Sequence, residues 1–401
     1  MATPVYAALG WPRRATPTIC LMDNLTHSFV GLAAAKAGLE RLSPGATTLC
    51  LLAANSPDSD IIVLAFGDRW AFLEHHRGIT HAIVGVTALA VLLPLIFHFV
   101  DRLWARFRSQ PAKTNLKGLM LASLIVTATH PVLDWTNNYG IRFLLPWNQK
   151  WSYGDLVFVV DPYLWLILGG AAFLLTARTR LLKFIWAALA AVLTFLVVAS
   201  SRSDNLPNPR LIAILWIVVL VVLIVLSVKN ARERWGTRIA FTAFALVLCY
   251  WSALGFAHAR AVARGSEAAA RLAGANGEVV ARLAAMPRLA DPFRWDCVFE
   301  TDRATYRFEV GLMGDAAIGN AVRYVKPEGE LKETFDAIAQ QRPVRIFLGF
   351  ARFPVAQLAD PSCTTQTLVQ LADLRYTEPG RSRGSFTLDV PVDCPNEQLA
   401  R

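Results

Sequence analysis

Charged residues are scarce in this chain, and long apolar runs are abundant. Asp, Glu, Lys and Arg make up 17% of the 401 residues, against 54% hydrophobic residues, whereas a soluble domain carries about 25% charged residues. This shortage excludes an ordinary soluble enzyme and indicates an integral membrane protein. The formal net charge of +10 fits basic cytoplasmic loops beside anionic lipid. No segment resembles a nucleic-acid-binding module, so no nucleic-acid partner is expected.

Cysteine is also scarce, and it follows no metal-binding pattern. None of the six cysteines forms a CxxC pair or a Cys/His finger spacing, which excludes a structural zinc site built on thiolates. Cys297, Cys363 and Cys394 lie in the polar C-terminal part. We expect that part to face an oxidising compartment, where one disulfide is favoured. Both Cys363–Cys394 and Cys297–Cys394 remain open.

Long apolar runs are the dominant feature of the first two thirds of the chain. A bilayer core needs about 20 apolar residues, so each run of 17 to 19 residues is a candidate spanning helix. Two shorter segments, 29–42 and 46–54, are expected to form a hairpin that packs among the longer helices. The second should end at Ser56-Pro57, because proline removes a backbone donor. The spanning candidates are 82–100, 118–134, 161–177, 183–200, 211–228 and 239–257.

Lys and Arg gather in every second connection between these runs, at 101–117, 178–183 and 229–238. By the positive-inside rule, these basic loops face the cytoplasm. His81 and the C-terminal part, 258–401, then lie on the opposite side, the periplasmic face of a bacterial inner membrane crossed several times.

The C-terminal part has a different composition. An Ala/Arg/Glu-rich stretch at 259–286 is expected to be helical, with an interruption near 274–277. Alternation with period two predicts strands beyond it. Together these segments predict a small α+β domain. Its expected elements are strands at 296–300, 306–310, 344–348, 367–376 and 385–390, and a polar helix at 329–341.

Residues 1–21 do not resemble a signal peptide, because two arginines follow the only apolar patch. Met22 resembles a natural start, so we expect residues 1–21 to be a mis-assigned start or a disordered tail. The predicted fold class is mainly α. A polytopic helical membrane domain with a metal site, 22–257, is followed by a small extracytoplasmic (periplasmic) α+β domain, 258–401.

Polar motifs interrupt this apolar sequence at four places. His27 is expected to open the first apolar helix, and the six residues from His76 to His81 directly precede the run 82–100. Such groups beside membrane-grade segments are costly unless they are paired or bound to something. A shared metal site is the simplest common cause. The predicted ligands are His27, Asp58, Asp60, His76, His81, His130 and Asp134.

The residue types and spacings suit a hydrolytic metal site. His130 and Asp134 lie one helical turn and about 40° apart, so both can reach one ion. Asp58 and Asp60 point in different directions, so one of them can bridge two ions while the other orients a ligand histidine. Imidazole and carboxylate without thiolate suit a divalent ion, with zinc preferred and Mn or Fe as alternatives. Arg77 would neutralise phosphate, and Asp58, Asp60 and Arg77 are the candidate catalytic residues.

Each motif alone also has an ordinary structural explanation. An Asp pair after a proline is typical of a helix N-cap, Thr80 can cap a helix, and a helix start explains Asp161-Pro162. The metal interpretation depends on the four motifs falling on one predicted face of the membrane.

The segments DNLTHSFVG, NSPDSD, HRGITH and THPVLDWTNNYG occur in this order within residues 22–175. They resemble the YdjM-type family of membrane-bound proteins described as metal-dependent hydrolases. FLGFARFP and LADLRY in the C-terminal part resemble segments of longer members. The resemblance implies metal-dependent hydrolysis by the polar set named above. The order of His and Asp is also similar to that in zinc-dependent phospholipase C and P1-type nucleases, but the N-terminal Trp ligand and a third His-x-x-x-Asp/Glu pair of those enzymes are missing.

The favoured hypothesis is a membrane-bound metal-dependent hydrolase that acts on a phosphoester of a lipid or lipid-linked substrate at the outer face. The C-terminal domain would cap the site or select the substrate. The alternative is a non-catalytic membrane scaffold whose polar cluster locks helices together and whose tail binds a partner. A transporter ranks lowest, because no inverted repeat is visible and the apolar cores within 183–257 lack ionisable residues.

Overall fold

The computed structural model describes residues 18–200, 209–313, 320–360, 362, 365–381 and 386–394. Most of the predicted N-terminal tail, residues 1–17, lies outside the described residues, and residues 18–21 form the beginning of the first helix. The chain divides into two compact units. The larger contains Met22–Asp60 and Arg77–Val325, and the smaller contains Ile61–His76 and Lys326–Arg401.

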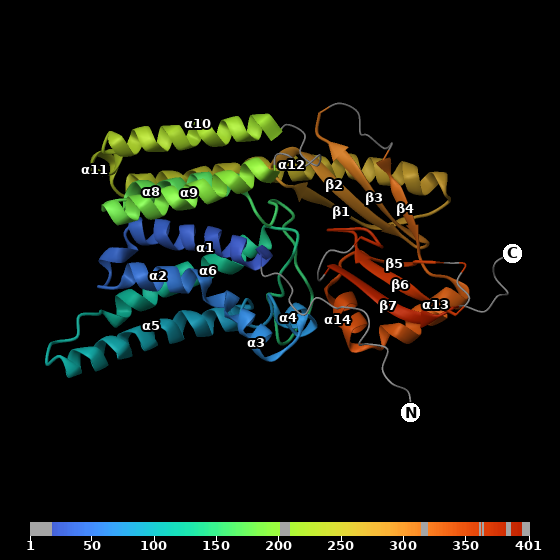
Figure 1. The fold of residues 1–401 in the computed structure, drawn as a ribbon, viewed down its shortest axis with the longest axis horizontal. Helices are drawn as coiled ribbons and strands as arrows, with labels where there is room; N and C mark the ends of the chain where they lie inside the picture. The colour runs from blue at the N-terminus through green and yellow to red at the C-terminus, as the bar shows by residue number, and fades with distance from the viewer. Residues whose placement is uncertain are drawn as a thin grey trace. The chain divides into compact units, whose positions relative to one another are not determined.

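The larger unit is mostly helical, as Figure 1 shows. Helices α1, α2, α5 and α6 pack together through small residues, among them Ala34, Ala53 and Ala122. Gly31 on α1 is needed for this packing, because a Cβ there would lie 2.7 Å from the carbonyl oxygen of Cys50 on α2. The helices are α1 Thr18–Lys36, α2 Ala46–Asn55, α5 Ile83–Phe107, α6 Leu116–Trp135, α7 Pro162–Leu164, α8 Gly170–Thr176, α9 Arg180–Ser200, α10 Pro209–Val228, α11 Ala231–Trp235 and α12 Arg238–Ala275, with short 3-10 helices at Leu39–Arg41 and Ser56–Ile62 and a π-helical turn at Trp165–Gly169.

Six of the described helices are long and apolar enough to cross a membrane. Most side chains of Arg210–Val228 are exposed although this segment has a mean hydropathy of 3.5. Lipid is the environment that such a surface requires. The prediction of a polytopic helical membrane domain followed by a small α+β region is therefore confirmed. The six segments are Ala46–Phe66, Ile83–Phe107, Leu116–Trp135, Arg180–Ala199, Arg210–Val228 and Arg238–Ala275.

The membrane region departs from the prediction in three places, of which only the first is a wrong boundary. The first helix spans Thr18–Lys36 rather than 29–42, so His27 lies in its middle and does not open it. The predicted span 161–177 is a shorter apolar helix, Pro162–Thr176. The α-helical part of the second segment ends at Asn55, as the proline predicts, but the 3-10 turn that follows extends the helical path to Phe66.

The C-terminal stretch 259–286 is helical up to the predicted interruption near 274–277, but residues 280–286 form a strand and were predicted wrongly as helix. α12 continues without a break from Arg238 to Ala275, and β1 begins at Val280. α12 contains no proline. Gly277, just after it, adopts a left-handed conformation with φ of +65°, which ends the helix.

Four antiparallel strands pack against the C-terminal part of α12. They follow each other in the sheet in the order β1-β2-β3-β4. Small residues Ala261, Gly265 and Ala268 let the helix approach buried Trp295 and Phe299 of β2. The strands are β1 Val280–Arg288, β2 Asp291–Thr301, β3 Ala304–Gly311 and β4 Val322–Val325. The strands predicted at 296–300 and 306–310 are confirmed, because they lie within β2 and β3.

The smaller unit contains a second, three-stranded sheet in the order β5-β6-β7. The strand predicted at 344–348 is wrong, because Val344, Phe347 and Phe350 are buried at a helical spacing on α14. The polar helix at 329–341 and the strands at 367–376 and 385–390 are confirmed within a few residues. The elements are α3 Val63–Phe66, α4 Arg69–His75, α13 Gly329–Ala339, α14 Arg342–Phe350, β5 Pro354–Leu358, β6 Gln366–Asp373 and β7 Thr387–Asp393.

The expected disulfide involves Cys394, which is disulfide-bonded. Cys297 is buried and free, so the pairing Cys297–Cys394 is excluded. Cys363 lies outside the described residues.

Candidate metal centre

Side chains from four separate segments of the larger unit meet at one point. α1 contributes His27, the 3-10 helix Ser56–Ile62 contributes Asp58, the loop before α5 contributes His81, and α6 contributes His130 and Asp134. The two histidines His81 and His130 are fully buried, and Asp134 is 1% exposed. Five of the seven predicted ligands therefore lie together.

Four donor atoms face one another at the spacing that a tetrahedral metal ion imposes. The Nε2 atoms of His81 and His130 are 3.1 Å apart. Asp134 Oδ2 lies 3.2 Å from His81 Nε2 and 3.3 Å from His130 Nε2, and Asp58 Oδ1 lies 3.3 and 3.6 Å from the same nitrogens. Ligands held tetrahedrally at about 2.0–2.1 Å from zinc are about 3.3–3.4 Å apart. The arrangement therefore fits one ion held by two imidazoles and two carboxylates.

Hydrogen bonds behind the rings fix which nitrogen faces the cluster. The Nδ1 of His130 lies 2.6 Å from the carbonyl oxygen of Ala54. Because a carbonyl only accepts, Nδ1 must donate, and the lone pair of the neutral ring is then on Nε2, inside the cluster. The Nδ1 of His81 faces Asp60 Oδ2 at 3.4 Å. Asp60 thus stands behind a candidate ligand, in the position of an orienting carboxylate.

Asp134 is held from both sides. Its Oδ2 faces the two imidazoles, while its Oδ1 lies 2.8 Å from Arg77 Nη2 and 3.4 Å from His27 Nε2. The His27 ring also stacks on His130, with ring centroids 3.6 Å apart. His27 and Arg77 therefore position Asp134 and His130 from outside the group of four donors.

Arg77 is itself held in place by the segment after α6. Its Nη1 donates to the backbone oxygen of Asp134 at 3.2 Å and to Asn137 Oδ1 at 2.9 Å, and its guanidinium lies over the ring of Tyr139. Asp60 Oδ2 accepts from the Arg77 backbone nitrogen at 2.9 Å. The predicted phosphate-binding role of Arg77, which is 3% exposed, would require the guanidinium to leave these contacts.

Asn137 and Tyr139 were not predicted as site residues. Both lie in the motif THPVLDWTNNYG, directly after the ligand pair. The polar run directly after His130 and Asp134 could have indicated that these residues support the site.

The carboxylates of the cluster favour the protonated form of His81 when no metal ion is bound. Burial alone would lower the pKa of His81, but its hydrogen bonds with Asp134 and Asp58 outweigh burial and raise that pKa. A proton and a metal ion therefore compete for the same space between the donors.

His76 belongs to the smaller unit, at the end of α4. It is 8% exposed, and its ring stacks on Phe72 with centroids 4.6 Å apart. Its role as a ligand stays a prediction.

The loop that carries His81 depends on a close backbone approach. A Cβ on Gly85, in the first turn of α5, would lie 1.9 Å from the carbonyl oxygen of Ile79. Gly85→Ala is therefore expected to displace this loop and to destabilise the protein by about 1–3 kcal/mol, as overpacking does, with weaker metal binding.

Gly255→Ala on α12 is the matched control, because nothing lies within 4 Å of a Cβ at that position. It should be neutral or slightly stabilising. Detergent-induced unfolding of both variants measures the difference, and equal effects would contradict the close approach.

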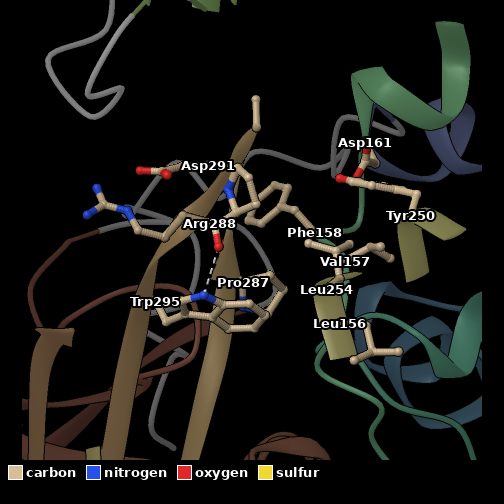
Figure 2. Close-up of a pocket in the computed structure, with 12 residues that line it drawn as sticks. Leu156, Val157, Phe158, Asp161, Tyr250, Leu254, Pro287, Arg288, Asp291 and Trp295 are labelled. Carbon is tan, nitrogen blue, oxygen red and sulfur yellow. Dashed lines mark hydrogen bonds between the residues drawn. The ribbon is translucent and has the colours of Figure 1, made fainter. Parts of the chain in front are cut away.

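A second buried carboxylate lies apart from the four donors, in a small pocket beside the β1–β2 hairpin (Figure 2). Asp161 caps α7 by accepting from the backbone nitrogens of Tyr163 and Leu164, and its Oδ2 accepts from the Tyr250 hydroxyl at 2.8 Å. Burial raises the pKa of Asp161 to about 6. The space has room for about one water. The helix-start explanation of Asp161-Pro162 is confirmed.

Comparison with known proteins agrees with this description. Residues 22–204 match the family described as YdjM inner membrane protein. The chain is 28% identical over 132 residues to the inner membrane protein YbcI of Escherichia coli (strain K12), an alignment that covers 31% of this chain and 68% of the relative. No solved structure matches the chain. With six apolar helices among the described residues, this is a multi-pass inner membrane protein, and its residues 22–204 are similar to the YdjM inner membrane protein family.

Proposed function

We propose that the cluster binds a divalent metal ion, with zinc as the first choice, and that the protein hydrolyses a phosphoester of a lipid or lipid-linked molecule. The observation that carries this proposal is the geometry of the four donor atoms. Two imidazole nitrogens and two carboxylate oxygens have five mutual distances between 3.1 and 3.6 Å. Imidazole with carboxylate suits zinc, manganese or iron.

The residues of the chain divide the work between holding the ion and handling the proton. His81, His130 and Asp134 hold the ion, which when bound polarises the phosphoryl oxygen and lowers the pKa of water. A catalytic ion needs its fourth position for water, and Asp58 would be the ligand that yields it. Its side chain is 15% exposed, whereas the other three are at most 1% exposed.

The reaction consumes one water. A bond forms between the water oxygen and phosphorus, the bond from phosphorus to the leaving oxygen breaks, and the products are an alcohol and a phosphate. We assign the transfer of the water proton to the leaving oxygen to Asp58. Asp60 and Arg77 act by keeping His81 and Asp134 in place.

The membrane location supports a lipid substrate. Positive loops define the cytoplasmic side, and the ends of α5 and α6 that carry the cluster lie at the opposite side under that rule. We therefore propose an outer-face site, with the C-terminal residues 258–401 in the periplasm. Selection of the substrate by this part remains part of the proposal.

Burial of the cluster favours one alternative function. With His27, His81, His130, Arg77 and Asp134 at most 3% exposed, the same side chains can lock α1, α5 and α6 together as paired charges, without metal or catalysis. Such a scaffold would keep its fold in a chelator, whereas a metal site would lose its ion.

Elemental analysis of detergent-purified protein tests the proposal. Wild type is expected to hold about one Zn, Mn or Fe per chain, and His130→Ala should lose nearly all of it because a tetrahedral site loses a ligand. His98→Ala is the matched control, since His98 lies on α5 and contacts Thr114 instead of the cluster. Hydrolysis of a water-soluble phosphoester should follow the metal content. A wild type that holds no metal after reconstitution with these ions would overturn the hydrolase and leave the scaffold.

A further inference from the structure

A groove on the membrane domain is polar at one end and apolar along the rest. It encloses about 440 Å³, within the roughly 300–1,000 Å³ of typical ligand pockets. All of its walls belong to the larger unit. They are Ser28, Asn55, Ser56 and Ser59 at the polar end and Leu51, Leu52, Leu89 and Leu93 along the apolar part.

The polar end of the groove lies next to the candidate metal centre. Ser56 and Ser59 flank Asp58 on the same 3-10 helix, and Ser28 follows His27 on α1. Asp58 is also the ligand that is open to solvent. A molecule whose polar group occupied this end would therefore present it beside the four donors.

One polar atom in this wall has an unused hydrogen-bonding capacity. Asn55 donates through Nδ2 to Ser28 Oγ and to the Leu51 backbone oxygen. Its Oδ1 is buried and has no donor among the described residues. A buried acceptor without a partner is costly, and a ligand hydroxyl or protonated phosphate oxygen would satisfy it once the Asn55 side chain turned toward the groove.

The apolar part of the groove leads away from the cluster and into the bilayer. Leu51 and Leu52 precede Asn55 by about one helical turn, and Leu89 and Leu93 follow the start of α5 by two to three turns. Both walls lie in candidate spans, Ala46–Phe66 and Ile83–Phe107. At this depth the surrounding molecules are lipid chains.

We propose that this groove binds the hydrocarbon chain of a phosphate-bearing amphiphile and places its phosphoester beside Asp58. The inference rests on the proposed function for the identity of the reaction. It adds the substrate class, a lipid phosphate with a single hydrocarbon chain that enters the groove sideways from the bilayer. Each added methylene should raise the partition of the amphiphile from water into the bilayer about fourfold, so the apparent affinity should rise with chain length.

Photolabelling tests the groove without relying on catalysis. The probe is a long-chain alkyl phosphate with a diazirine in mid-chain, added to the full-length protein in phosphatidylcholine nanodiscs and mapped by mass spectrometry. Saturable labelling is expected in the peptides that contain Leu51–Asn55 and Leu89–Leu93. Unlabelled alkyl phosphates should compete better as their chains lengthen, whereas inorganic phosphate should compete weakly.

Two matched leucine variants locate the binding. Leu52 lines the groove and is 51% exposed, and Leu124 on α6 is 52% exposed but lies outside it. Leu52→Trp should fill the groove and abolish most of the saturable labelling, because the indole occupies the space of the chain. Leu124→Trp should leave labelling unchanged.

The outcomes separate this inference from the proposed function. Labelling that does not saturate, or that falls equally in both variants, overturns the groove even if the protein hydrolyses water-soluble phosphoesters. Competition by inorganic phosphate as strong as by alkyl phosphate also overturns it, because the headgroup alone would then bind. Saturable labelling in a protein without metal or activity supports the groove and overturns the hydrolase.

Discussion

Arg77→Ala is expected to destabilise the membrane domain by about 3–5 kcal/mol, the cost of removing one partner of a buried ion pair. The guanidinium lies 2.8 Å from Asp134 Oδ1, and the two side chains are 4% and 1% exposed. Without Arg77, the carboxylate keeps its negative charge in a site that solvent does not reach. Detergent-induced unfolding of purified protein measures the change.

Arg282→Ala provides the contrast. Arg282 makes a similarly short ion pair with Glu300, at 2.6 Å, but its side chain is 51% exposed, and surface pairs contribute about 0–1 kcal/mol. The two variants should therefore differ strongly although both remove one arginine from one carboxylate. Similar unfolding midpoints would mean that water reaches Asp134, and the burial of the cluster would then be wrong.

The metal content of Arg77→Ala adds a second readout. Removing a group that orients a ligand lowers metal affinity by about 10–100-fold, whereas a scaffold without metal would show only the loss of stability. Partial recovery by Arg77→Lys is expected, since lysine restores the charge but not the contacts of Nη1 with Asn137.

The sequence predicted which side chains gather at one point better than it predicted what each of them contacts. His81, His130 and Asp134 were predictable because charged and imidazole groups beside apolar runs need a partner. The different directions of Asp58 and Asp60 were also predicted, but the assignment of Asp58 to the cluster and Asp60 to the back of His81 was not, because it depends on the 3-10 geometry of Ser56–Ile62. The stacking of His27 on His130 arises from helix packing, and nothing in the local sequence around His27 indicates it.

Errors in the fold have a common physical origin. α12 was predicted as two pieces because its first part is apolar and its second is Ala/Arg-rich, yet both compositions are helical and no breaker separates them. In α14, β-branched and aromatic residues favour a strand locally, but the spacing of Val344, Phe347 and Phe350 buries one helical face. The continuity of α12 and the helical state of α14 both depend on how these segments pack in the folded protein, which local composition does not indicate.

Asp58→Asn and Asp60→Asn should separate the two acidic roles that the sequence left interchangeable. Asp58 Oδ1 faces both Nε2 atoms, so Asp58→Asn removes a charged ligand and the assigned proton carrier together. Hydrolysis should fall by at least about 10³-fold, the combined loss of metal and general acid–base catalysis. Asp60 contacts His81 only through Nδ1 and holds the Arg77 backbone.

Asp60→Asn should therefore weaken metal binding by about 10–100-fold and regain activity when excess metal is added. That rescue is the decisive readout. Excess metal restores the occupancy of a site that has lost an orienting residue, but it cannot replace a lost proton carrier. Metal titrations of hydrolysis on both variants give the comparison. Rescue of Asp58→Asn to wild-type rates, with Asp60→Asn left inactive, would exchange the two roles and place the reacting water on the His81 Nδ1 side of the cluster.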